Sequence, residues 1–146
     1  MEQMTITAKV QIVATDADKV LLDETMSVYR DACNYVSNHV FQTHDLKQFS
    51  LNKVLYSTLR EKFGLKSQMA QSVLKTVIAN YKSILKNQNK WIQPNFKKPQ
   101  YDLVWNRDYS LTQNCFSVNT LNGRVKLPYF AEGMSKYFDN TIYRFG

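Results

Sequence analysis

Four polar and basic side chains recur along the segment 67–87 at a spacing that could make a binding surface: Gln71, Lys75, Lys82 and Lys86. At about 100° per residue, a helix would place them within about 60° of one another. Lysine ammonium groups on one face can neutralise the phosphates of a polyanion. A glutamine amide can pair with the edge of adenine. We expect this face to contact nucleic acid; the alternative is an ordinary solvated helix surface.

A second set of residues alternates aromatic rings with positive charge. Rings can stack on unpaired bases while Lys and Arg hold phosphates. Tyr101 and Trp105, at strand spacing, are more typical of a core. Phe96, between prolines and beside two lysines, is harder to bury and is the better contact candidate. The set comprises Trp91, Phe96, Lys97, Lys98, Tyr101, Trp105, Arg107 and Tyr109.

Residues for catalysis or metal binding are much harder to find in the sequence. His39 and His44 have no nucleophile or base partner that the pattern identifies, and the acids near Asp16 suit the start of a helix without any chemistry. Cys33 and Cys115 are far apart and form no CxxC or Cys/His ligand pattern. We therefore expect no catalytic residue, metal site or cofactor in this chain.

The charge of the chain favours an anionic partner. Its 146 residues carry a net charge of +7, and the pI is about 9.4. No acidic residue occurs between Glu61 and Asp102. Such a one-signed interval suits a polyanion. The N-terminus has no signal-peptide pattern, and no apolar run approaches the ~20 residues that span a bilayer. We expect a cytoplasmic protein, with neither a membrane nor a small-molecule partner.

Three amphipathic helices are expected to position the basic face. The first covers about 17–41, with Thr15 as N-cap and Asp18 completing a capping box. Ser50 is expected to cap the second, which turns Leu51, Val54, Leu55 and Leu59 inward and ends near Gly64. Ser67 is expected to cap the third, which runs to about Asn87. Three such helices can bury their apolar stripes against one another.

Strand patterns lie on both sides of the helical region. Alternation predicts a half-buried strand over 4–13. The prolines of 91–100 indicate an extended linker, followed by strands that include 101–105, 125–129 and 141–145. Asn122-Gly123 predicts a type I′ hairpin turn. The fold class is therefore α+β, and an apolar ending without a polar tail suggests a piece of a longer protein.

Several short segments occur in an order that resembles the beginning of TnpB, the OrfB-type protein of bacterial insertion sequences. The similarity covers essentially the whole chain. The segments are Ala-Cys-Asn-Tyr-Val (32–36), Pro-Asn-Phe-Lys-Lys (94–98), 101–109, Asn-Gly-Arg-Val-Lys-Leu-Pro (122–128) and 142–145.

The resemblance implies an RNA-guided DNA nuclease, of a family related to type V CRISPR effectors and long described as transposases. It implies a partial split β-barrel, the wedge (OB-like) domain, formed by 1–13 and 91–146. A three-helix recognition domain, 14–90, would be inserted after its first strand. These parts would hold a structured guide RNA and target DNA and read a short motif beside the target. Gln71 and Asn106 fall at motif-reading positions, whereas Leu51 and Ser67 depart from residues seen in some relatives.

The family's RuvC-like acidic residues and four-cysteine zinc finger lie C-terminal of this sequence. The chain itself would then not be an enzyme, and Mg and Zn would belong to the absent part of a parent endonuclease. Two alternatives are a DNA-binding transposase subunit that acts without RNA and a protein-interaction or dimerisation module. The expected nucleic-acid-binding residues are Gln71, Lys75, Lys82, Lys86, Lys90, Phe96, Lys97, Lys98, Asn106, Arg107, Arg124 and Lys126.

Overall fold

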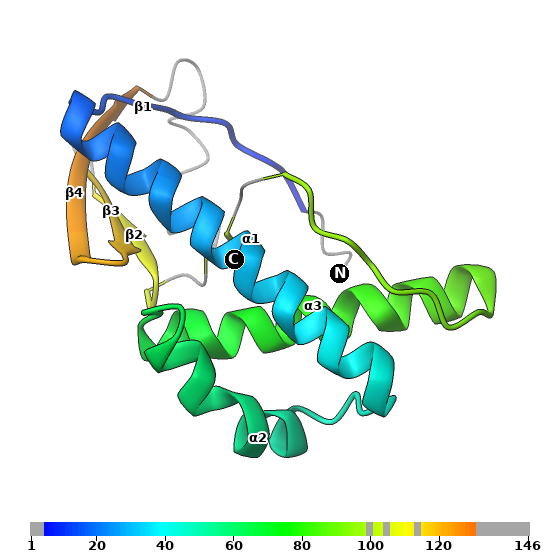
Figure 1. The fold of residues 1–146 in the computed structure, drawn as a ribbon. Coiled ribbons are helices and arrows are strands. Elements are labelled where there is room, and N and C mark those ends of the chain that lie inside the picture. Colours follow the sequence, from blue (N-terminus) through cyan, green and yellow to red (C-terminus); the bar gives the residue numbers. More distant parts are fainter. Residues whose placement is uncertain (1–4, 99–100, 104–105, 113–114, 131–146) are drawn as a thin grey trace.

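The fold combines three helices with a four-stranded antiparallel sheet, so the α+β class is confirmed (Figure 1). The computed structural model describes residues 5–98, 101–103, 106–112 and 115–130. The helices are α1 (Asp16–Thr43), α2 (Gln48–Glu61) and α3 (Ser67–Gln88). The strands are β1 (Gln11–Ile12), β2 (Tyr109–Leu111), β3 (Cys115–Thr120) and β4 (Gly123–Phe130), in the spatial order β1-β4-β3-β2.

Helix α1 begins at the predicted capping box. The backbone N–H of Asp18 donates to Thr15 Oγ1 at 3.2 Å, and the N–H of Thr15 donates to Asp18 Oδ2 at 3.3 Å. The helix ends at His44, which has a left-handed φ of 57°. Both signals are local in the sequence, which is why the expected range of 17–41 agrees closely with the observed one.

The predicted N-caps of α2 and α3 are wrong. The caps are Lys47 and Lys66, and neither supplies a side-chain cap bond. Helix α2 starts before Ser50 because the carboxylate of Asp45 accepts a 2.9 Å bond from the N–H of Lys47 and so organises the turn before the helix. Ser67 is instead the first residue of α3.

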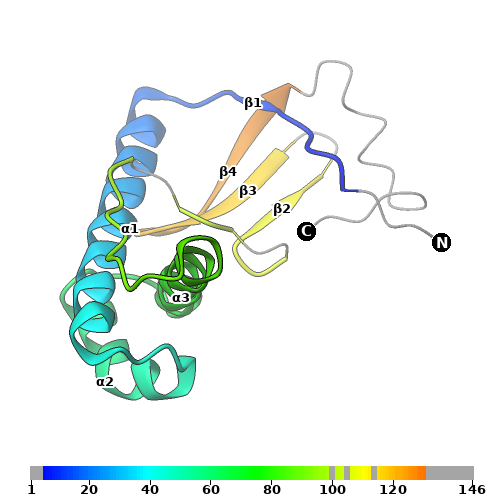
Figure 2. The ribbon, with the colours of Figure 1, turned by 90° about the vertical axis from the view of Figure 1, so that its right-hand side faces the viewer.

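The hydrophobic core lies among the three helices. Figure 2 shows α3 end-on beside α1, with α2 below them. The buried residues of α2 are all leucines, but Val54, expected inward, is 59% exposed. The largest fully buried side chains of this core are Tyr29, Tyr81, Leu51, Leu59, Leu65, Met69 and Leu74.

Strands β3 and β4 form a hairpin whose register pairs Phe116 with Leu127 and Val118 with Val125. Their turn is not the predicted type I′ turn at Asn122-Gly123. Thr120 pairs with Gly123, so the central residues lie one position earlier, and the left-handed residue is Gly123 itself, with φ 99°. Thr120 Oγ1 fixes this turn because it accepts from the N–H of Asn122 at 3.2 Å and donates to the carbonyl of Gly123 at 2.8 Å.

The first strand is much shorter than predicted. Only Gln11 and Ile12 pair, opposite Phe130 and Tyr129 of β4. Residues 5–10 of the predicted range are described and are not in a strand. Within 101–105, the described part (101–103) is not a strand, and the strand expected over 141–145 also lies outside the described residues.

The sheet packs beside the N-terminal half of α1 (Figure 2). The backbone N–H of Leu121, in the β3–β4 turn, donates to Thr25 Oγ1 of α1 at 3.3 Å. Tyr101 also connects α1 to the sheet. Its ring lies 6.1 Å from that of Tyr29 in α1, and its hydroxyl donates to the carbonyl of Asn119 in β3. Tyr101 is therefore a packing residue, as its strand-like spacing indicated.

Candidate nucleic-acid interface

Helix α3 presents the predicted basic face to solvent. Lys75, Lys82 and Lys86 are all exposed, and α3 contains no acidic residue. In the described parts of the chain the one ion pair joins Arg30 to Asp31 at 3.2 Å, so the three lysines have no carboxylate partner there. Unpaired cations on one face remain available to an anionic ligand.

Lys75 and Lys82 line the same pocket, which is open on one side and has a volume of about 260 Å³. Its apolar lining comes from Ile78, which is buried, and from Leu46 and Ala79. Gln48, at the start of α2, completes it. The structure thus brings together two of the predicted cations around an apolar surface. Lys86 lies farther along α3, and Lys90 lies beyond the end of that helix.

Gln71 is held by helix α2 at both ends of its amide. Its Nε2 donates to Asn52 Oδ1 at 2.6 Å, and its Oε1 accepts from Gln48 Nε2 at 3.1 Å. This makes Gln71 a connector between α2 and α3 rather than a free amide. Gln48 was missed by the sequence reasoning because the misplaced cap at Ser50 left it outside the helix; the correct start sets Gln48 and Asn52 one turn apart.

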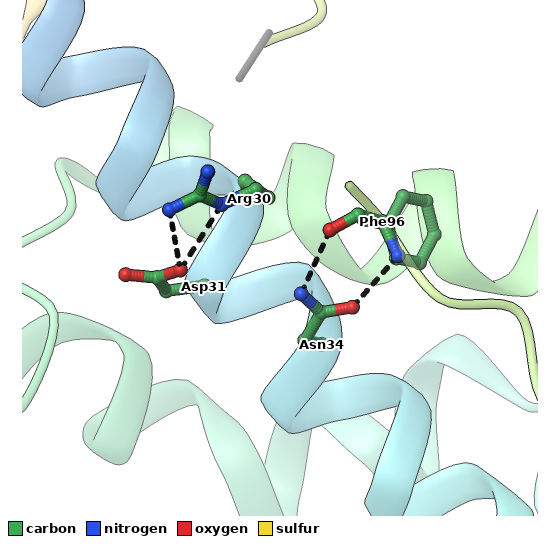
Figure 3. A network of polar contacts seen from close by, with 4 residues as sticks. All are labelled: Arg30, Asp31, Asn34 and Phe96. Carbon is green, nitrogen blue, oxygen red and sulfur yellow. Dashed lines mark hydrogen bonds and ion pairs between the residues drawn. The ribbon is translucent and has the colours of Figure 1, made fainter. Parts of the chain in front are cut away.

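The extended segment 91–98, which we call the strap, is tied along α1. Trp91 Nε1 donates to the carbonyl of Phe41 at 3.1 Å, and Ser37 Oγ donates to the carbonyl of Pro94 at 2.8 Å. Asn34 bonds both backbone groups of Phe96 (Figure 3). The predicted extended conformation is confirmed, and the strap has fixed attachment points.

The expectation that Phe96 is hard to bury is wrong. Phe96 is half-buried and packs against the helical core, because Asn34 satisfies its backbone and lets the ring turn inward. Trp91 is also engaged: its ring stacks on His44 with centroids 4.3 Å apart and lies 4.7 Å from Tyr81. These rings are therefore occupied by protein contacts, whereas the charged neighbours on the strap, Lys97 and Lys98, are exposed.

A second cationic group lies on the polar face of the sheet. Arg124 Nε donates to Ser117 Oγ at 2.8 Å, its Nη1 to the carbonyl of Arg107 at 3.0 Å and its Nη2 to Ser110 Oγ at 3.4 Å. Lys126 is exposed two residues along β4 and so shares this face. The structure therefore places Arg124 and Lys126 on one face of the sheet, with the backbone of Arg107 beside Arg124.

Asn106 lies in the turn before β2. It is exposed, and its φ of 69° is a left-handed conformation that asparagine tolerates better than most residues. Its backbone N–H donates to the carbonyl of Tyr109 at 2.7 Å. The turn thus holds the predicted motif-reading residue at the surface beside Arg107.

Perturbed titrations concentrate on tyrosines. Burial raises the pKa of Tyr29, although its hydroxyl bonds to Ser72 and Thr76 oppose the shift. Tyr56 is exposed at its hydroxyl, and its pKa is lowered by hydrogen bonds with Ser67 and Arg60. Within the described ranges, no three His, Cys, Asp or Glu side chains gather where they could share a metal ion. None of the helices there has the length and apolar character needed to cross a bilayer.

Comparison with known proteins adds no relative: no protein-family model, curated protein or solved structure matches the chain.

Proposed function

We propose that this chain binds nucleic acid through the lysine face of α3 and the arginine-lysine face of the sheet. The observation that carries the proposal is the position of Lys75 and Lys82 on one open pocket, without a carboxylate partner among the described residues. Cations of this kind gain by releasing counterions from a phosphate backbone. Acidic residues are absent from all of α3, so the attraction is not cancelled locally.

The sheet face adds a guanidinium that is already oriented. A guanidinium has five N–H donors, and three protein acceptors hold Arg124. The remaining donors can bond a phosphate with little further loss of side-chain freedom, because the group no longer has to be ordered on binding. Lys126 beside it supplies a second charge.

The resemblance to TnpB gives this proposal its specific form. The chain would be the recognition part of a bacterial, cytoplasmic RNA-guided DNA endonuclease, holding guide RNA and target DNA while RNA pairing reads most of the sequence. The chain order supports it, because the three helices come between β1 and the strands of the same sheet. We assign 14–90 to the inserted recognition domain and 1–13 with 91–146 to the wedge barrel. Cleavage with Mg, and the Zn finger, would belong to the parent protein's further domains.

Fluorescence anisotropy with a structured RNA and a short DNA duplex, each across a salt series, tests the proposal. We expect binding at low salt whose logarithmic affinity falls linearly with the logarithm of salt concentration. Absence of binding at low salt, or affinity independent of salt, would contradict it. RNA that co-purifies with the protein supports the RNA-guided form, and purification without RNA favours a DNA-binding subunit.

A protein-interaction or dimerisation module is the second candidate, favoured by exposed apolar residues. Phe49 on α2 is 74% exposed and Phe130 at the end of β4 is 58% exposed. Such side chains are typical of interfaces. Reversing the charge of Lys82 and Lys86 separates the two candidates, since it should abolish polyanion binding and leave an apolar interface nearly intact.

A further inference from the structure

The pocket on α3 combines three kinds of chemistry in a small space. Ile78 and Leu46 provide an apolar floor, Lys75 and Lys82 provide positive charge, and Gln48 provides an amide. At about 260 Å³ the pocket is smaller than the roughly 300–1,000 Å³ of sites for drug-sized molecules. A ligand that uses all three features must therefore be small and flat on one side, and must carry anionic groups.

The amide of Gln48 is held by Gln71, which Asn52 orients in turn. Asn52 Oδ1 accepts from Gln71 Nε2, which orients Gln71, and Gln71 Oε1 then accepts from Gln48 Nε2. Gln48 lines the pocket, and no described residue donates to its Oε1, so this oxygen and the second amide hydrogen have no partner among the described residues. An amide oriented in this way presents one donor and one acceptor, the pair that reads a base edge.

We infer that this pocket holds a single unstacked nucleotide of a bound strand. The base would lie on Ile78 and Leu46 with its edge at Gln48, while its flanking phosphates meet Lys75 and Lys82. The two lysines are seven residues apart on α3 and so about 10 Å apart along the helix axis. This inference rests on the proposed nucleic-acid binding and gives it a base-dependent contact at Gln48 rather than at Gln71.

Charge complementarity favours this occupant over a purely apolar one. An apolar side chain of a partner protein would bury Lys75 and Lys82 without any anion to pair them, and burying an unpaired charge is costly. A nucleotide pairs both ammonium groups with phosphates that stay partly in water. The same floor still removes the base from solvent.

The test compares single strands of about ten nucleotides, a length that one small domain can cover, with abasic strands of the same backbone. Deoxyribose and ribose pairs are measured separately by anisotropy, which identifies whether the nucleotide belongs to DNA or RNA. We expect about tenfold tighter binding of the intact strand in at least one series, the factor for removing roughly 50–60 Å² of apolar surface from water.

Ala79→Leu fills the pocket from an exposed helical position and should remove this preference for the intact strand. Asn80→Leu is the matched control, since Asn80 is exposed on the next position of α3 and does not line the pocket. Gln48→Ala, on the other helix, should also reduce the intact-to-abasic ratio.

Equal affinity for intact and abasic strands, with normal salt dependence, would overturn the nucleotide site and leave the proposed function standing. A preference that survives Ala79→Leu and Gln48→Ala would also overturn it. Failure of every strand and duplex to bind would sink the proposed function and this site together.

Discussion

The side-chain amide of Asn34 bonds to both backbone groups of Phe96, 62 residues later: Nδ2 donates to the Phe96 carbonyl at 2.9 Å, and Oδ1 accepts from its N–H at 2.8 Å. One side-chain amide thus makes the two backbone hydrogen bonds that a neighbouring strand would make to an extended segment. The strap owes its course along α1 to this contact and to those of Ser37 and Trp91.

Replacing Asn34 by Ala should destabilise the fold by about 1–3 kcal/mol, because it leaves a partly buried N–H and carbonyl without protein partners. Urea unfolding followed by circular dichroism measures the change. Asn80→Ala is the control, since Asn80 makes a single exposed bond to the carbonyl of Thr76. Equal stability of the two variants would show that the strap does not depend on this amide.

Arg124 should have separable roles in stability and in binding. Arg124→Lys keeps the charge but loses the three-way contact with Ser117, Ser110 and the Arg107 carbonyl, so we expect about 1–2 kcal/mol less stability with nearly the same salt dependence. Lys126→Gln should leave the stability nearly unchanged and should reduce the salt dependence of binding. If urea unfolding finds Arg124→Lys as stable as the natural chain, the bonds to Arg124 contribute no net stability.

Neutralising Lys82 should change how binding responds to salt. For a duplex, each lost phosphate contact lowers the slope of log affinity against log salt by about 0.9, so Lys82→Gln should shift it by about that amount. Anisotropy across a salt series measures the slope. Lys19→Gln is the control, because Lys19 is exposed at the start of α1 among acidic residues. The same shift in both variants would point to a diffuse charge effect.

Stability should fall at alkaline pH. Burial raises the pKa of Tyr101 from 10.0 to about 12 and also raises that of Tyr29. Folding therefore favours the neutral phenols, so their contribution is complete below pH 10 and is lost as pH rises toward 12. Each group contributes at most about 1.4 kcal/mol per pH unit. Tyr101→Phe should reduce the fall measured by urea unfolding between pH 9 and 12; an unchanged fall would exclude Tyr101 as its source.

Features set by adjacent residues could be predicted from the sequence. Thr15 and Asp18 lie within one turn and define the start of α1 without help from elsewhere. The alternation over 125–129 likewise predicted a strand within β4, although the predicted turn, which sets the register with β3, lay one residue too late. The cap of α2 was misplaced because serine is a frequent cap, while the bond from Lys47 to Asp45 depends on a particular loop geometry.

Features set by distant residues could not be predicted. Phe96 was expected at the surface because its neighbours are lysines and prolines, and nothing near it reveals that Asn34 will satisfy its backbone. Gln71 lies on the predicted face of α3, but its partners come from α2. The pocket depends on how α2 packs against α3. The helical periodicity of α3 therefore predicted Lys75 and Lys82 but could not predict Gln48 on α2.

The pairing of β1 with β4 also governs the order in which the molecule can fold. The contact between Leu121 and Thr25 already joins positions 96 apart in the sequence, and Gln11 with Phe130 spans more. Closing such long loops is slow compared with local helix formation. During translation α1, α2 and α3 can assemble while β1, although it is synthesised before them, remains unpaired until β4 is made. A strand that is synthesised before the helices is thus among the last elements to pair.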